Sequence, residues 1–391
     1  MPPAPRLADV VAVLEELYDP RWAEPWDAVG LVCGDPEAEV GKVLLAVDPV
    51  AAVAEEALAW GADLVVTHHP LFLRGVHGVP ATTPKGRLVH RLVSHGVALH
   101  VAHTNADTAA PGVSDALAAA IGLAELRPLS PTAPDPVDKI VAFVPRDSAD
   151  RLVDALAAAG AGSLGDYTRV AYLLDGTGTF RPEPGARPAI GGVGRIETVA
   201  ETRVEMLLPR GRRRAAVEAL RATHPYEEPA FDVIDVIETA DRPGPRGLGR
   251  VGRLASPTSL RELGRRVAAA LPATPAGVRV GGDLDRTVAT VAVCGGAGDS
   301  LFDEVRRSGA DAYVTADLRH HPVSEALSDG AFGIVDAAHW ATEWPWLADA
   351  ARRLPRALGE RGTSVAVRVS TIVTDPWGEH LPASHGQGSA R

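Results

Sequence analysis

The sequence has little cysteine. Only Cys33 and Cys294 occur among its 391 residues, and they lie far apart in the chain. A disulfide framework like that of small secreted domains is therefore excluded, and so is a zinc finger built from paired cysteines. The first residues lack the basic start and apolar run of a signal peptide, and no apolar run is long enough to span a bilayer. We therefore expect a cytoplasmic protein that has no membrane partner.

An excess of positive charge is also absent. The chain has 50 acidic and 39 basic residues, which gives a formal net charge of −11. We therefore expect no general nucleic-acid-binding surface, although bound metal would supply a local positive site. The apolar fraction of 46% is ordinary for a globular protein, so large cores can form. A chain of this length is expected to form two or three domains.

The first part of the chain, residues 1–130, alternates predicted strands with predicted helices. Strands are expected at 42–47, 64–67 and 97–103, and helices at 7–18, 50–60, 84–95 and 114–121. This alternation predicts βαβ units and a largely parallel sheet. Residues 246–378 return to the same alternation, and residues 379–391 are expected to form a flexible tail. The pattern therefore predicts an α/β fold.

These two parts of the chain contain an internal echo. Gly61-Ala62-Asp63 and Gly309-Ala310-Asp311 each follow a predicted helix and precede a predicted strand, and Val66-Thr67 corresponds to Val314-Thr315. Short α/β units can look alike by chance. The alternative is that two related halves form one metal-binding domain, with residues from distant positions sharing one cleft.

The middle of the chain, residues 131–245, has a different pattern. Strands are expected at 139–145 and 230–237, helices at 150–159 and 211–223, and a long hairpin at 192–209. Stretches rich in proline and glycine at 130–136 and 242–249 are candidate linkers. We therefore predict an inserted α+β domain of common size.

An adjacent histidine pair follows the predicted strand at 64–67. His68 and His69 come directly after this strand, and Pro70 ends it. Ligands of open α/β sheets bind at the carboxyl ends of strands. Adjacent side chains at a strand end point in different directions, so the two histidines could serve two different metals. Two exposed loop residues would give the same pattern.

Two further strand ends carry metal-binding groups. Asp107 follows the strand at 97–103 and could supply a terminal or bridging carboxylate, although a turn residue would look the same. His103 is a candidate for orienting Asp107 or a bound water. His339 and Glu343 follow a third apolar strand at 332–335, and their spacing puts both on one helix face. A solvated helix face is the alternative for this last pair.

Taken together, these residues predict a two-metal site with His68, His69, Asp107, His339 and Glu343 as ligands. Nitrogen and carboxylate ligands suit Zn, Mn, Fe, Co or Ni. Five ligands are too many for one tetrahedral zinc and too few to saturate two metals, so positions stay open for water or substrate. Two divalent ions with two carboxylates leave about two positive charges, which a phosphate-bearing substrate would balance.

Other polar stretches leave more than one interpretation open. The segment from Cys294 to Gly298 could cradle phosphate, but it lacks the Lys and Ser/Thr of a P-loop, so a tight turn is the alternative. Asp317, His320 and His321 lie near the corresponding strand end of the second half, where they could bind metal directly. His320 and His321 could instead support the site indirectly. Glu227, in the inserted domain, could face the cleft or belong to a rigid turn.

The motifs resemble those of the Nif-three-like proteins, which are also called type 2 GTP cyclohydrolase homologues. The matching stretches are WDAVGLVCGD (26–35), VVTHHPLF (65–72), HTNADTAAPGVSDALA (103–118), CGGAGDSL (294–301) and DAAHWATEWP (336–345). GVGRIE (193–198) and HPYEEPAFDV (224–233) resemble the PII/CutA-like insertion of longer family members. One departure is Ala28, where the family usually has Asn.

The resemblance implies a dinuclear centre on the five ligands named above, and a toroidal homohexamer with its metals facing an inner cavity. It also implies a metal-dependent hydrolase acting on a nucleotide or phosphorylated small molecule, with GTP ring opening as the activity claimed for some members. In that case His103 or Glu227 would move protons, and the attack would fall on C8 of GTP or on another electrophilic centre. The alternative is a non-catalytic metal-binding hexamer with a regulatory or scaffold role.

Overall fold

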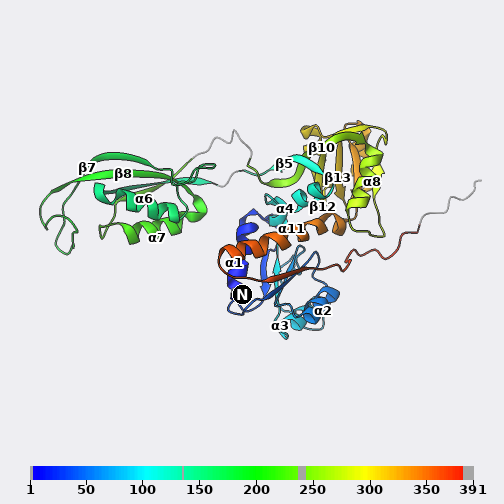
Figure 1. The fold of residues 1–391 in the computed structure, drawn as a ribbon, viewed down its shortest axis with the longest axis horizontal. Coiled ribbons are helices and arrows are strands. Elements are labelled where there is room, and N and C mark those ends of the chain that lie inside the picture. Colours follow the sequence, from blue (N-terminus) through cyan, green and yellow to red (C-terminus); the bar gives the residue numbers. More distant parts are fainter. Residues whose placement is uncertain (1–2, 134–135, 237–243, 382–391) are drawn as a thin grey trace, which may run out of the picture. The chain divides into compact units, whose positions relative to one another are not determined.

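The computed structural model describes residues 3–133, 136–236 and 244–381, which form a mixed α/β structure with several sheets (Figure 1). The chain separates into two compact units. The first unit combines the chain up to Thr132 with the chain from Gly244 onward, and the second unit runs from Ala133 to Pro243. Each unit has its own sheets and its own core.

The first sheet of the first unit has five strands. In spatial order they are β1 (Gly30–Cys33), β4 (Ala98–Val101), β3 (Leu64–Thr67), β2 (Lys42–Ala46) and β15 (Ala366–Val369). β4, β3, β2 and β15 run parallel, and β1 pairs antiparallel with β4 at the edge. β15 therefore comes from the far end of the chain to complete a sheet that is otherwise built from the first hundred residues.

The second sheet has six strands and also mixes distant parts of the chain. In spatial order they are β11 (Arg279–Gly281), β14 (Gly333–Ala337), β13 (Ala312–Ala316), β12 (Thr287–Ala297), β10 (Gly247–Ser259) and β5 (Leu123–Pro131). β12, β13 and β14 run parallel, and the other three pair antiparallel with their neighbours. The prediction of parallel strands is therefore confirmed for the centres of both sheets, whereas the antiparallel edge strands were not predicted.

One large core joins the two sheets through a long helix. This helix, α11 (His339–Glu360), contacts β2 and β15 of the first sheet and β12 and β13 of the second (Figure 1). Its Trp346 and Leu347 are fully buried in the same core as Val66 and Val314. Further helices of this core are α1 (Leu7–Leu17), α5 (Val113–Ala120) and α8 (Leu260–Ala270). The carboxyl ends of strands from both sheets can therefore contribute to one site.

The outer faces of the sheets are covered by separate helices. α2 (Ala51–Trp60) and α3 (Pro84–Val93) pack on the first sheet, and α9 (Phe302–Ser308) and α10 (His320–Ser328) pack on the second. Gly61 and Gly309 end α2 and α9 in the left-handed conformation, with φ of 70° and 72°. The aspartate two residues after each glycine makes a matching contact. Asp63 accepts hydrogen bonds from two backbone amides at the start of β2, and Asp311 accepts them from two backbone amides of β12. The relation between the halves stays a prediction.

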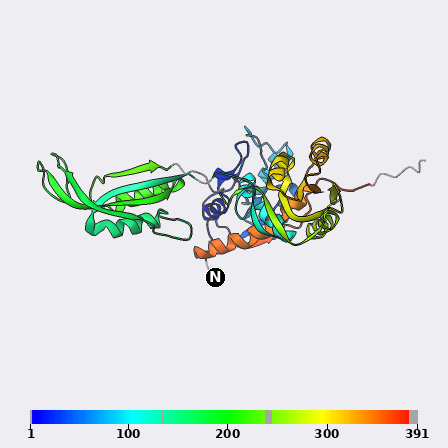
Figure 2. The same ribbon diagram turned by 90° about the horizontal axis from the view of Figure 1, so that it is seen from above.

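The second unit has a four-stranded antiparallel sheet with helices on one face (Figure 2). The spatial order is β7 (Tyr172–Phe180), β8 (Glu197–Pro209), β6 (Val137–Pro145) and β9 (Phe231–Asp235), and the helices are α6 (Ala149–Ala158) and α7 (Arg213–Thr223). The hairpin expected within 192–209 is wrong, because most of that stretch is the single strand β8, whose hairpin partner is β7. Gly176 and Gly178 weaken the strand pattern of β7, so it was not predicted.

A buried histidine of the first sheet is expected to make stability depend on pH. His100 in β4 is 2% exposed, and burial lowers its pKa from 6.5 to about 4. The unfolded chain therefore takes up a proton below pH 6.5 that the folded chain refuses until about pH 4. Stability should fall over this range by about 3 kcal/mol.

His100→Leu should remove this part of the pH dependence. Urea unfolding of the metal-free variant and metal-free wild type at several pH values measures the free energy of unfolding of each protein. If the difference in free energy of unfolding between the variant and wild type stays the same from pH 7 to pH 4, the assignment to His100 is contradicted.

Candidate metal centre

Polar side chains of the first unit gather where five parallel strands end. Asp48 follows β2, and His68 and His69 follow β3. His103 follows β4 and precedes the short helix α4 (Thr104–Thr108), which carries Asp107. In the second sheet, Asp317 follows β13, while His339 and Glu343 lie in the first turns of α11, after β14. The carboxyl ends of both sheets therefore supply one cluster, as open α/β sheets commonly do.

Four imidazoles of the cluster are held in the same way. The Nδ1 atom of His69 donates to Asp48 at 2.7 Å, that of His103 to Asp27 at 2.8 Å and that of His339 to Asp317 at 2.7 Å. The Nδ1 atom of His68 donates to the carbonyl oxygen of Ala102 at 2.9 Å. Each ring therefore keeps Nε2 free of its proton for a ligand when it is neutral, which is how metal-binding histidines are usually oriented.

The Nε2 atoms converge on the carboxylate of Glu343. Oε1 of Glu343 lies 2.9 Å from Nε2 of His339 and 3.4 Å from Nε2 of His68. Oε2 lies 3.0 Å from Nε2 of His69, and the Nε2 atoms of His69 and His339 are 3.2 Å apart. Two ligands on one tetrahedral metal, each about 2.0–2.1 Å from it, lie about 3.3 Å apart. The spacing of these atoms therefore fits a shared metal ion.

A second group of atoms overlaps the first. One ligand atom each from His68, His69 and His103 lies within 4.8 Å of the others, as do those of His69, His339 and Glu343. Asp107 is next to the group that contains His68, and its Oδ1 atom lies 3.7 Å from Nε2 of His68. The described residues therefore offer two adjoining sets of groups that could hold metal ions.

The buried atoms of the cluster are poorly satisfied without an ion. His68 is fully buried and Glu343 is 3% exposed, yet Nε2 of His68 and Oε2 of Glu343 form no hydrogen bond. Buried polar atoms rarely lack a partner, and a bound ion is one explanation when they do. The donor set and the buried atoms therefore both fit metal binding.

Charge is concentrated on the same atoms. Burial opposes the protonated form of His69, but the charge of Glu343 and the bond to Asp48 raise its pKa to about 10. Burial likewise opposes protonation of His339, yet Glu343 and Asp317 raise its pKa to about 11. The surrounding imidazoles overcome the effect of burial on Glu343 and hold its pKa well below the usual value. Metal ions would take the place of protons on these rings.

A glycine near the end of β12 leaves room for the two candidate ligands of α11. Gly296 has φ of +69°, and a Cβ there would lie 2.6 Å from Oε1 of Glu343 and 3.1 Å from Nε2 of His339. Its amide donates to Thr342 at 2.9 Å, and the amide of Gly295 donates to Ser114. Most of this segment is therefore the irregular end of β12 and not a separate tight turn, and the amides of Gly295 and Gly296 are already used within the protein.

Gly296→Ala is expected to displace Glu343 and lower the metal content by at least about half, because the added methyl group occupies the space of a ligand atom. Gly309→Ala is the matched control, since Gly309 has φ of +72° but no atom within 4 Å of its Cβ position. Elemental analysis of both purified variants gives the comparison. Equal metal content in the two variants would show that the contact with Glu343 does not matter.

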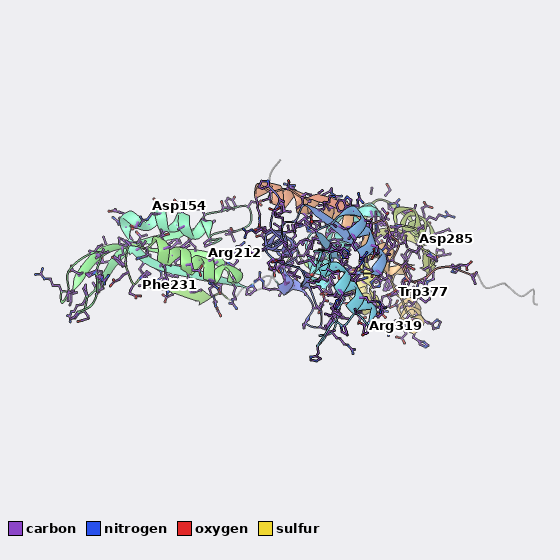
Figure 3. All side chains as sticks on the ribbon, turned by 90° about the horizontal axis from the view of Figure 1, so that it is seen from below. Asp154, Arg212, Phe231, Asp285, Arg319 and Trp377 are labelled. Atoms are coloured by element: carbon purple, nitrogen blue, oxygen red, sulfur yellow. The ribbon has the colours of Figure 1, made fainter. Side chains whose placement is uncertain are left out.

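A cavity of about 830 Å³ opens onto the cluster. Its walls include His69, His103 and His339, together with Arg279 and two tryptophans, Trp340 and Trp377. Trp377, labelled in Figure 3, lies in the segment after β15 and is 67% exposed. The same segment contacts the cluster, because Thr374 donates to the carboxylate of Asp48. The cavity is large enough for a nucleotide-sized ligand.

The structure brings together His68, His69, Asp107, His339 and Glu343, the five residues predicted as ligands. His103 lies against them, with its ring centroid 5.2 Å from that of His68 and 5.6 Å from that of His69, while its Nδ1 atom donates to Asp27. His320 and His321 are exposed at the start of α10 and belong to neither group of candidate ligand atoms within the described chain. Glu227 lies in the second unit, where it accepts from the amide of Arg187 at 2.8 Å.

The groups that orient the rings were not predicted from the sequence. Asp27 and Asp48 were not singled out, and Asp317 was weighed only as a ligand. Asp48 gave a usable signal, since it directly follows a predicted strand, as the histidines do. Asp27 precedes β1 in an irregular segment, so only the folded chain reveals that it binds His103 and Thr104.

Comparisons with known proteins agree over nearly the whole chain. A family model described as Duf34/NIF3 (NGG1p interacting factor 3) matches residues 5–376. The GTP cyclohydrolase 1 type 2 homolog of Mycobacterium tuberculosis is 51% identical over 95% of this chain and 96% of its own length. The Bacillus subtilis protein of the same name is 36% identical over 94% of this chain and 97% of its own.

A solved structure gives the same result. The crystal structure of a Bacillus cereus protein related to NIF3 superimposes with a TM-score of 0.85 at 32% identity, covering 96% of this chain and 99% of that one. Among the described residues, no helix combines the length and the apolar character needed to cross a membrane.

Proposed function

The chain belongs to the Duf34/NIF3 family, and from this premise we propose that it is a dinuclear metal-dependent hydrolase of a nucleotide or phosphorylated small molecule. The observation that carries the proposal is the set of imidazoles whose Nε2 atoms converge on Glu343 while acceptors hold their Nδ1 atoms. The relatives are named GTP cyclohydrolase 1 type 2 homologs, so GTP is the first substrate to test.

We assign His68, His69, Asp107, His339 and Glu343 as ligands of two divalent ions drawn from Zn, Mn, Fe, Co and Ni. Glu343 would supply the central carboxylate of the site, because its two oxygens face different histidines. Two such ions would supply Lewis-acid activation of water and charge stabilisation for a phosphorylated substrate. The imidazoles are held at Nδ1 by hydrogen-bond acceptors, so their positions need little reorganisation during a reaction.

Proton movement is assigned to His103. Its Nδ1 atom donates to Asp27, which fixes the tautomer that leaves Nε2 able to accept a proton. Hydrogen bonds from His103 and Thr104 overcome the effect of burial and hold the pKa of Asp27 far below its usual value. Asp27 therefore stays ionised and stabilises a protonated His103, which can return the proton to a leaving group.

The test is turnover of GTP by the metal-loaded protein, followed through the loss of guanine absorbance as the imidazole ring opens. Glu343→Gln should reduce turnover by at least about a thousandfold, since it removes the central charge of the site. Glu360→Gln, at the exposed far end of the same helix, should retain full activity. Full activity of Glu343→Gln would contradict the proposal.

The alternative is a non-catalytic metal-binding hexamer with a regulatory or scaffold role. The second unit motivates it, because a whole domain is inserted into the metal-binding unit. β5 and β10 pair at their outer ends, with Pro131 opposite Gly247, so a short linker can replace residues 133–243. If that deletion abolishes assembly while no phosphorylated substrate is ever turned over by the full chain, the scaffold role is favoured.

We further propose a toroidal homohexamer in the cytoplasm, in which the second unit is a PII/CutA-like domain and the first unit consists of two related halves. The family resemblance of the motifs and the low cysteine content support these assignments. Sedimentation velocity measures the assembly, and a mass near that of one 40.8 kDa chain would contradict the hexamer.

A further inference from the structure

The second unit contains a cavity that the metal centre does not use. Its volume is about 570 Å³, within the range of small-molecule sites. The floor is the face of the sheet that α6 and α7 leave open, because Ile140, Val204 and Met206 of β6 and β8 point toward those helices and their neighbours point away. The wall is formed by residues 182–190 and 226–230.

Two glycines make the floor hollow. Gly176 of β7 has no atom within 4 Å of its Cβ position, so the space above it is open. At Gly178 a Cβ would lie 2.0 Å from an oxygen of Glu201, so the absent side chain is what lets this carboxylate lie over the strand. The hollow is therefore a product of the sequence GTG in β7.

Aromatic rings line the hollow beside carboxylates. Phe180 and Tyr226 pack with ring centroids 5.6 Å apart, and the hydroxyl of Tyr226 donates to Glu201 at 3.0 Å. Glu228 also lines the cavity and has no side-chain hydrogen bond or ion pair to any described residue. Negative charge next to aromatic faces favours a cation, which the rings and the carboxylates both attract.

The protein already places one cation in this environment. Arg203, the single basic side chain lining the cavity in the described chain, lies over Phe143 with its guanidinium carbon 5.5 Å from the ring centroid. Its Nε atom donates to Glu205 at 2.7 Å, so its charge is balanced outside the cavity. Glu201, Glu227 and Glu228 therefore face the cavity with no basic side chain to neutralise them all.

We propose that this cavity binds an organic cation with an apolar or aromatic body, of the size of a small amine. The ammonium or guanidinium group lies by Glu201 and Glu228, and the apolar body lies over Gly176 against Phe180 and Leu174. Leu174 is 53% exposed in the absence of a ligand, and covering it adds apolar burial to the charge interaction. The site is independent of the metal centre in its residues and its chemistry.

The test uses three probes of similar size on the full-length protein: 2-phenylethylamine, 2-phenylethanol and 3-phenylpropionate. Calorimetric titration should show the amine binding at least about tenfold more tightly than the alcohol, a difference of about 1.4 kcal/mol, and the anion should not bind. Equal or tighter binding of the anion, or of GTP at this cavity, would overturn the proposal, as would no binding of the amine at millimolar concentration.

Variants separate charge from shape. Glu201→Gln combined with Glu228→Gln should weaken amine binding at least about tenfold, while the hydrogen bond of Tyr226 can persist to the amide oxygen. Gly176→Leu should abolish binding, because the new side chain fills the open space above the strand. Glu218→Gln, on exposed α7 across the sheet, is the control and should bind like wild type.

The metal content should be unchanged in all of these variants. Amine affinity that falls as the protein concentration rises would show that a second copy of the chain fills the cavity, and would overturn the small-molecule site. Binding that survives both Gly176→Leu and the double glutamine variant would also overturn it.

Discussion

Replacing His69 and Glu343 together by alanine should reduce bound metal from about two ions per chain to nearly none. Glu343 contacts three of the imidazoles through its two oxygens, and His69 belongs to both groups of candidate ligand atoms. The double change therefore removes a ligand from each proposed ion and the negative charge between them. Loss of the buried carboxylate also removes the negative charge on which the Nε2 atoms of His68 and His339 converge, so a partial site is disfavoured.

The matched control is the double variant His320→Ala, His321→Ala. It also removes two neighbouring imidazoles, but these are exposed on α10 and lie outside the candidate ligand groups. Metal is measured by plasma mass spectrometry on untagged proteins whose circular dichroism matches wild type. Less than one ion per wild-type chain, unchanged in the His69 and Glu343 variant, would mean that the cluster is not a metal centre.

Arg250→Met should lower the free energy of unfolding by about 3–5 kcal/mol, the usual cost of removing one partner from a buried ion pair. The Arg250 side chain is 2% exposed and pairs with Asp115 of α5 at 2.7 Å. Its guanidinium also donates to the carbonyl oxygens of Gly247, Gly249 and Ala109. Methionine fills the space but leaves the partly buried carboxylate of Asp115 and three carbonyls without this donor.

The effect should reach the metal centre, because Ala109 directly follows α4, the helix that carries Asp107. Arg253→Met, an exposed position on the same strand, is the control and should cost less than about 0.5 kcal/mol. Urea unfolding of the metal-free proteins gives both values. A loss below about 1 kcal/mol for Arg250→Met would show that the buried network contributes little.

Much of the site could be predicted because its residues follow strands in a simple order. His68-His69 after an apolar run and the four-residue spacing of His339 and Glu343 are local signals, and the ends of parallel strands meet at one edge. The first strands and helices were also placed within a few residues, since their apolar patterns match the period of each element.

The rest depends on contacts between distant residues. β15 pairs with β2, and β5 pairs with β10, although the local sequence of these segments does not indicate which strand each will pair with. The carboxylates that hold the rings are equally hard to predict. Asp27, before β1, has the sequence context of an ordinary turn residue, and only the fold brings it to His103. β7 was missed because its glycines break the apolar alternation, and those same glycines form the hollow of the second unit.

The pairing of β15 with β2 also sets an order of events during synthesis. His69 and His339 are separated by 270 residues in the chain. At about 5–20 residues per second, a ribosome needs about 14–54 s to make the second histidine after the first. During that time the emerging first half has its histidine pair but lacks Glu343 and the last strand of its sheet. The nascent chain therefore cannot assemble the full cluster of candidate ligands until Glu343 has been made.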